Sequence, residues 1–120
     1  MIRVLEFFGL LAYCGLLYWL SDQPGLPAPT WFPGQDKLYH AGAYFLLAVS
    51  VWCNLSYIIK RPIILAAAVI VFSSLYGASD EWHQSFVPGR SNDVWDWLAD
   101  TVGAGLAVLV LFTRYMKNVF

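Results

Sequence analysis

The sequence is poor in charge. Asp, Glu, Lys and Arg make up only 12% of its 120 residues, whereas about 25% is usual in soluble globular domains. Hydrophobic residues account for 59%, above the usual level of about 45–50%. The net charge is −1 and the basic residues form no long run, so the composition gives no indication of nucleic-acid binding. It predicts an integral membrane protein with one domain over residues 1–120.

Cysteine is scarce as well. The chain has two cysteines, Cys14 and Cys53, and each lies inside an apolar segment. They lack the spacing of metal ligands, and two such residues do not make a disulfide scaffold. We therefore expect both to be small residues of the packed interior.

The chain does contain long apolar segments. A helix that crosses the hydrocarbon layer needs about 20 mainly apolar residues. Four segments meet or approach this length: residues 4–20, 38–59, 63–78 and 97–112. The last two are short and can gain length from the flanking polar turns. The sequence therefore predicts an all-α membrane protein, a bundle of four transmembrane helices.

The first apolar segment has a second interpretation. A basic residue, an apolar run and a polar stretch in this order are also typical of a signal peptide. This run is longer than a usual signal-peptide core, and no small-residue cleavage motif follows it. We therefore expect a helix that is retained in the protein.

Lys and Arg indicate which way the bundle faces, because they concentrate on the cytoplasmic side of a membrane. Basic residues precede the first segment, join the second to the third and follow the fourth: Arg3, Lys60, Arg61, Arg114 and Lys117. This alternation predicts that both termini are cytoplasmic. The other two connections then face outward, and they bring residues 36–37 to the same side as residues 79–100.

Charge gathers between the third and fourth segments, where the sequence places Asp80, Glu81, Arg90, Asp93, Asp96 and Asp100. Residues four apart share a helix face, which pairs Asp80 with Gln84 and Asp96 with Asp100. Pro88 ends any continuing helix. The next helix is expected to begin at one of three good N-caps, Ser91, Asn92 or Asp93.

Some of these charges have a purely structural interpretation. Asp93 and Asp96 suit the positive end of a helix, Asp36 with Lys37 suits an exposed pair, and Arg90 suits contact with lipid phosphate. Asp100 and His40 are different, because ionisable groups inside a membrane span are costly and usually paired. So many polar groups in so apolar a chain favour a functional site.

Three motifs bear a family resemblance. D-K-x-x-H-x-x-x-Y-x-x-L occurs at residues 36–47, D-E-x-x-Q-x-F-x-P-G-R at 80–90, and D-x-x-x-[N/D]-x-x-G-x-x-x-[G/A] at 96–107. Together they resemble the VanZ-like family of small bacterial membrane proteins over about residues 36–107. The family usually has Asn at the position of Asp100, and a carboxylate there alters the charge balance or the metal preference.

The resemblance implies a multi-pass protein of the bacterial cytoplasmic membrane. The founding member of the family is associated with low-level resistance to teicoplanin, a glycopeptide antibiotic. Membrane lipids or a lipid-linked cell-wall precursor are therefore the expected partners, nucleic acid is not, and a homo-oligomer remains open.

We expect an outward-facing site that binds, or binds and modifies, an anionic or phosphate-bearing envelope lipid. Three residues are candidates for acid–base catalysis: Glu81, Asp80 and His40. Seven are candidates for substrate binding: Lys37, Arg90, Gln84, Asp36, Tyr44, Asp96 and Asp100. Hard divalent cations prefer oxygen ligands, and the candidates for such an ion are Asp36, Asp80, Asp93 and Asp96.

Two alternatives stay open at this point. The first is a non-catalytic membrane module that shields or organises an envelope component. The second is a small proton- or ion-coupled transporter, in which Asp100 and His40 serve as relay residues. Whether the protein is an enzyme, and whether it needs a metal ion, is left undecided by the residues.

Overall fold

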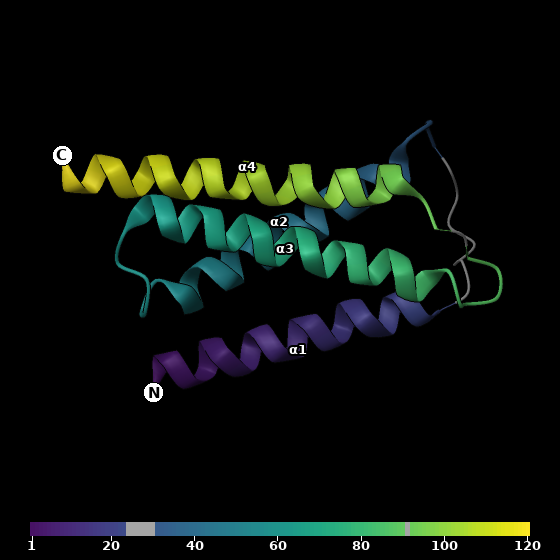
Figure 1. The fold of residues 1–120 in the computed structure, drawn as a ribbon, viewed down its shortest axis with the longest axis horizontal. Helices are drawn as coiled ribbons and strands as arrows, with labels where there is room; N and C mark the ends of the chain where they lie inside the picture. Colours follow the sequence, from purple (N-terminus) through teal and green to yellow (C-terminus); the bar gives the residue numbers. More distant parts are fainter. Residues whose placement is uncertain (24–30, 91) are drawn as a thin grey trace.

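The computed structural model describes residues 1–23, 31–90 and 92–120. These residues form four helices, α1 (Ile2–Asp22), α2 (Gln35–Leu55), α3 (Pro62–Gln84) and α4 (Val94–Val119). The helices run up and down side by side, and both termini lie at the same end as the α2–α3 connection (Figure 1). All four are long and apolar enough to cross a membrane, which confirms the predicted all-α architecture with four candidate spans.

Helices α3 and α4 are longer than the predicted apolar segments. Helix α3 continues past residue 78 to Gln84, and α4 begins at Val94. The added turn of α3 carries Asp80, Glu81 and Gln84, which are buried. Because these polar side chains lie inside the bundle, the helix continues beyond the apolar segment. Asp93 is the N-cap of α4, and its side chain accepts a hydrogen bond of 2.9 Å from the Trp95 amide. Ser91, another predicted cap, lies outside the described residues.

Small residues let the helices approach closely. A Cβ atom added at Gly103 of α4 would lie only 2.0 Å from the carbonyl oxygen of Ala41 in α2. Helix α1 packs against α2 and α3 and contributes Leu17 to the buried core. The rest of that core comes from α2, α3 and α4: Tyr44, Leu47, Ala48, Val51, Trp52, Leu65, Ala66, Val69, Ala104, Ala107 and Val108. Cys14 and Cys53 are half-buried and form no disulfide.

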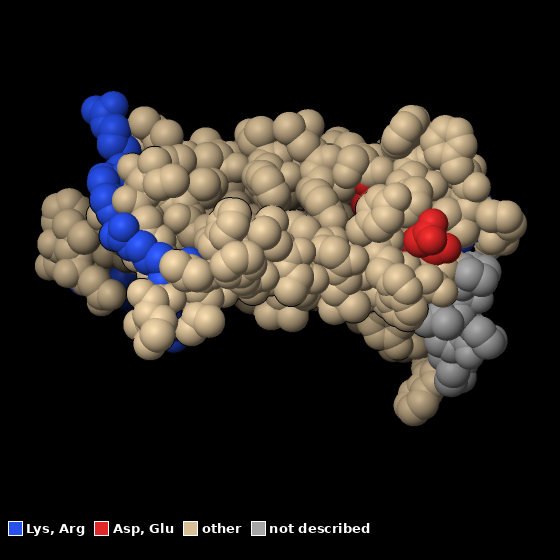
Figure 2. Space-filling view, turned by 90° about the horizontal axis from the view of Figure 1, so that it is seen from below, with Lys and Arg blue, Asp and Glu red and all other residues tan. Residues whose placement is uncertain are grey.

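The two ends of the bundle differ in charge. Figure 2 shows Lys and Arg side chains gathered at one end and acidic side chains toward the other. The basic end, as we call it, carries Arg3, Lys60, Arg61, Arg114 and Lys117, all of them exposed. The polar end consists of residues 35–40, 80–90 and 93–100, where α2 begins, α3 ends and α4 begins.

Candidate functional site

The polar end buries side chains that an apolar bundle does not need for packing. Five of them are at most 9% exposed: Asp80, Glu81, Gln84, Asp96 and Asp100. Burying a charged or polar group is costly unless it is paired or hydrogen-bonded. The partners of these five side chains therefore show how the site is built.

Lys37 of α2 lies among three carboxylates. Its Nζ atom donates hydrogen bonds of 2.7 Å to Asp36, 2.8 Å to Asp93 and 2.6 Å to Asp96. An ammonium group has three protons to donate, so these carboxylates use its full capacity. The hydrogen bond from Lys37 lowers the pKa of the Asp93 carboxyl below its usual range. Lys37 thus joins the first turns of α2 and α4, and binding an external phosphate would require it to release a carboxylate.

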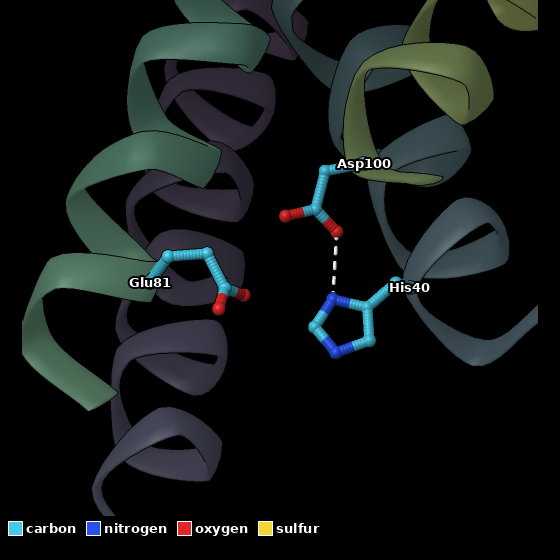
Figure 3. Close-up of side chains that lie close together, drawn as sticks. All are labelled: His40, Glu81 and Asp100. Carbon is cyan, nitrogen blue, oxygen red and sulfur yellow. Dashed lines mark hydrogen bonds and ion pairs between the residues drawn. The ribbon is translucent and has the colours of Figure 1, made fainter. Parts of the chain in front are cut away.

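His40, Asp100 and Glu81 form a second group, deeper in the bundle (Figure 3). The Nδ1 atom of His40 lies 2.8 Å from Oδ1 of Asp100, a hydrogen-bond distance. Glu81 comes from α3, and its Oε2 accepts a hydrogen bond of 3.1 Å from the Asp93 amide. Figure 3 shows the Glu81 carboxylate turned toward the other two side chains. The pairing of His40 with Asp100 meets the expectation that ionisable groups inside a span have partners.

The position of Asp100 is closely confined by α3. A Cβ atom added at Gly77 would lie 2.9 Å from Oδ2 of Asp100 and 3.1 Å from its Cβ. One turn away, the Trp97 indole donates a hydrogen bond of 2.9 Å to the Ser74 carbonyl, and the hydroxyls of Ser74 and Thr101 lie 3.0 Å apart. Glycine at position 77 therefore makes room for the carboxylate, while polar contacts hold α3 and α4 together beside it.

A cavity of about 210 Å³ opens beside these groups. Its apolar wall includes Leu17 and Leu20 of α1, and Ser21 and Tyr39 add polar atoms to the lining. Five of the residues predicted from the sequence also line it: His40, Tyr44, Asp80, Gln84 and Arg90. The hydroxyl of Tyr44 donates a hydrogen bond of 3.2 Å to Asp80.

Arg90 is the cation of this cavity. Its Nη1 atom donates a hydrogen bond of 3.3 Å to the Gln23 carbonyl. Within residues 1–23, 31–90 and 92–120, no ion pair of Arg90 with a carboxylate is found. Asp36 pairs with Lys37 instead, and 62% of its side chain is exposed. The guanidinium of Arg90 therefore keeps donors for a ligand, whereas the ammonium of Lys37 does not.

The predicted site residues thus occupy three places. Five line the cavity. Glu81 and Asp100 belong to the deeper group with His40. The outer group consists of Lys37, Asp36, Asp93 and Asp96. The contribution of α1 was missed. Ser21 alone carried a signal, as a polar residue at the end of an apolar run, and its hydroxyl donates a hydrogen bond of 3.4 Å to the Asp80 carbonyl.

The residues that group closely enough to share a metal ion differ from the predicted set. Asp36, Asp93 and Asp96 bond to Lys37, and Asp80 accepts from Tyr44. In the described part of the chain, three or more His, Cys, Asp or Glu donors come together at one place, formed by His40, Glu81 and Asp100. One donor atom from each lies within 4.8 Å of the others.

Comparison with known proteins gives a family. The profile of the VanZ/LLP1 family matches residues 32–115, a stretch that holds α2, α3 and most of α4 but leaves out α1. No curated protein and no solved structure matches the chain. The matched stretch contains every residue of the outer group and the deeper group, and all the polar residues of the cavity wall except Ser21 of α1.

Proposed function

The chain belongs to the VanZ/LLP1 family of membrane proteins, and on this premise we propose that its cavity binds the phosphate-bearing head group of a lipid-linked envelope component. The observation that carries the proposal is the position of Arg90. Its guanidinium lines the cavity without an ion-pair partner among the described residues. Guanidinium groups bind phosphate oxygens through paired hydrogen bonds, so this group suits a phosphate ligand.

The shape and lining of the cavity support an amphiphilic ligand. Leu17 and Leu20 provide an apolar wall opposite the polar residues of α2 and α3. The volume of about 210 Å³ lies below the roughly 300–1,000 Å³ of most small-molecule sites. The cavity therefore suits one phosphate with the adjoining part of its lipid chain, and a larger head group extends beyond it.

The location of the site is part of the proposal. We place the protein in the bacterial cytoplasmic membrane with both termini in the cytoplasm, because the basic end carries the termini and basic residues favour the cytoplasmic side. The cavity then opens at the outer leaflet. A C-terminal fluorescent-protein fusion should be fluorescent and a C-terminal alkaline phosphatase fusion inactive; the reverse pattern would contradict this orientation.

Binding and turnover are separate questions at this site. His40 and Asp80 line the cavity, and Glu81 lies next to His40. All three therefore stay candidates for acid–base chemistry. Mass spectrometry of the lipid pool, with and without the protein, separates an enzyme from a non-catalytic module: only an enzyme forms a product that Glu81→Gln abolishes. The four buried carboxylates, Asp80, Glu81, Asp96 and Asp100, lie at one end of the described helices and not at mid-span. This grouping supports a head-group site over a transport path.

The binding test compares two arginines. Purified protein in detergent is mixed with a polyprenyl phosphate, and Arg90→Ala is compared with Arg114→Ala at the basic end. Loss of a hydrogen bond to a charged group costs about 1.5–3 kcal/mol, so we expect Arg90→Ala to weaken binding roughly 10- to 100-fold. Arg114→Ala should bind like the wild type.

Two further ligands and one further variant sharpen the test. An uncharged polyprenol of the same length should bind more weakly than the phosphate, because it offers nothing to Arg90. Leu17→Trp, which fills the apolar wall, should also reduce binding. Equal binding of phosphate and alcohol, or full binding by Arg90→Ala, would overturn the proposal. Teicoplanin susceptibility of cells that express these variants gives the cellular readout.

A further inference from the structure

The deeper group of the polar end has more buried acceptors than the protein satisfies. Oε1 of Glu81 and Oδ2 of Asp100 are buried and have no hydrogen-bond partner among the described residues. Glu81 is 4% exposed and Asp100 is 0% exposed. Leaving a charged acceptor buried and unsatisfied is costly, so two such atoms in one place point to a bound group.

Each member of this group uses one atom for the fold and keeps another for a ligand. Glu81 uses Oε2 for the Asp93 amide. Asp100 uses Oδ1 for Nδ1 of His40, at 2.8 Å. The other nitrogen of His40, Nε2, approaches Asp96 only to 3.7 Å, which is too long for a hydrogen bond. The side chains are thus held in place from one side and converge from three helices (Figure 3).

We propose that His40, Glu81 and Asp100 bind a divalent cation of the Zn²⁺ or Mn²⁺ class between α2, α3 and α4. One imidazole and two carboxylates suit these ions, whereas Mg²⁺ and Ca²⁺ prefer sites made wholly of oxygen. A cation would supply the positive charge that the two unsatisfied carboxylate oxygens lack. Three protein ligands also leave a coordination position for water or another oxygen.

The distances are compatible with an ion after a small adjustment. One donor atom of each residue lies within 4.8 Å of one donor atom of the other two. With bonds of about 2.0–2.2 Å, two ligands of a tetrahedral Zn²⁺ lie about 3.3–3.6 Å apart. The most widely separated donors therefore need to approach each other by about 1 Å, which rotation of the Glu81 and His40 side chains can provide. Asp100, confined by Gly77, is the fixed member.

The cation site is independent of the proposed lipid function. His40 belongs to both, since it lines the cavity as well, but Glu81 and Asp100 do not line it. Arg90 and the α1 wall are not needed to bind a metal ion. Failure of lipid binding with intact metal binding would therefore overturn one proposal and leave the other standing, and the converse also holds.

The first experiment is a Zn²⁺ titration of the purified full chain, after treatment with a chelator, followed by calorimetry. We expect one ion per chain. Glu81→Gln, Asp100→Asn and His40→Asn should each weaken binding by about 100-fold or more, because loss of a residue that only orients a metal ligand already costs roughly 10- to 100-fold.

Matched controls remove the same chemical groups elsewhere. Glu6→Gln removes a carboxylate whose Oε2 is also buried without a partner, in α1. Asp22→Asn and His83→Asn remove the members of a 3.1 Å pair near the same end. All three should bind Zn²⁺ like the wild type. Fewer than half an ion per chain, or equal loss in the controls, would overturn the proposal.

A further variant gives a positive signal that does not depend on loss of binding. Asp100→Cys puts a thiolate, another good ligand, at the confined position. With Co²⁺ as the probe, this variant should show a thiolate-to-cobalt charge-transfer band that the wild type lacks. Gel filtration and thermal unfolding establish that the variant is folded. A folded Asp100→Cys protein without the band would overturn the proposal.

Discussion

The two ends of the bundle use charge in opposite ways. At the basic end all five Lys and Arg side chains are exposed. Lys60 donates a hydrogen bond of 2.9 Å to the Ser56 carbonyl, and Arg3 of α1 lies 4.2 Å from the centre of the Tyr57 ring, just after α2. At the polar end five acidic or amide side chains are buried, and their contacts join different helices. Charge at the first end stays at the surface, whereas charge at the second links the helices.

This difference separates two kinds of charge in a small membrane protein, one at the surface and one inside the bundle. An exposed cation is solvated by water and head groups, so it needs no specific partner and its removal changes little else. A buried carboxylate needs a partner at a fixed distance, so the neighbouring helices must be arranged around it. Burial and cross-helix bonding, more than the number of charges, mark the polar end as the site.

The largest effect is expected where α2 and α4 touch. Gly103→Ala places a Cβ atom 2.0 Å from the Ala41 carbonyl oxygen, and backbone cannot yield without moving a helix. We expect a loss of about 3 kcal/mol in the free energy of unfolding, measured by SDS titration in mixed micelles. The polar end should lose its contacts while the basic end is unaffected.

The same helix offers a matched control. A Cβ atom at Gly105 meets nothing within 4 Å, so Gly105→Ala should be neutral or should stabilise the helix by about 0.5–1 kcal/mol. Equal destabilisation by both substitutions would show that the close approach at residue 103 is not the cause of the lost stability.

A smaller effect separates the two ends directly. Lys37→Met removes the one cation bonded to three carboxylates, and we expect it to cost about 1–3 kcal/mol of unfolding free energy. Lys60→Met, at the basic end, should stay within about 0.5 kcal/mol of the wild type. The SDS titration used for Gly103 measures both, and equal effects would contradict the contrast between the ends.

The smallest effect is a pH dependence at Asp93. Because Lys37 lowers the pKa of this carboxyl, its contribution to stability is complete above the ordinary pKa of 3.8. It disappears as the pH falls through the lower value of the folded protein. Asp93→Asn keeps a good N-cap and removes only the charge. The variant should be less stable at neutral pH, and the difference from the wild type should shrink as the pH falls below the ordinary pKa of this carboxyl.

Thermal unfolding between neutral pH and pH 3, recorded in parallel for both proteins, measures this difference. Asp36 and Asp96 also bond to Lys37, but they are present in both proteins and cancel in the comparison. A difference that persists unchanged at low pH would show that Asp93 acts through its shape and capping alone.

The sequence predicted the elements better than their lengths. Apolar segments located all four helices. The spacing placed Asp96 and Asp100 on one face of a helix, and the structure adds that both are buried. Hydropathy ended the third segment at residue 78 because it treats Asp80 and Glu81 as groups that avoid the membrane. It has no information on neighbouring helices, which bury both side chains and let α3 run to Gln84.

The pairings at the site depend on helix packing and were not predictable from spacing. Asp36 and His40 are four residues apart, which places them on one helix face, yet Asp36 bonds to Lys37 and His40 to Asp100. The bond partner of His40 lies 60 residues away along the chain. Likewise, nothing in the α1 sequence indicates that Leu17 and Leu20 complete a cavity formed by residues of α2 and α3.

The contact of Gly103 with Ala41 also affects how precisely His40 and Asp100 are held. Ala41 follows His40 directly in α2, and Gly103 lies three residues after Asp100 in α4. The place where the two backbones are pressed together is thus within a turn of the bond between His40 and Asp100. This pair is preorganised by a helix crossing and not by a loop, so small changes in the tilt of α4 pivot about this point and hardly alter the spacing of His40 and Asp100.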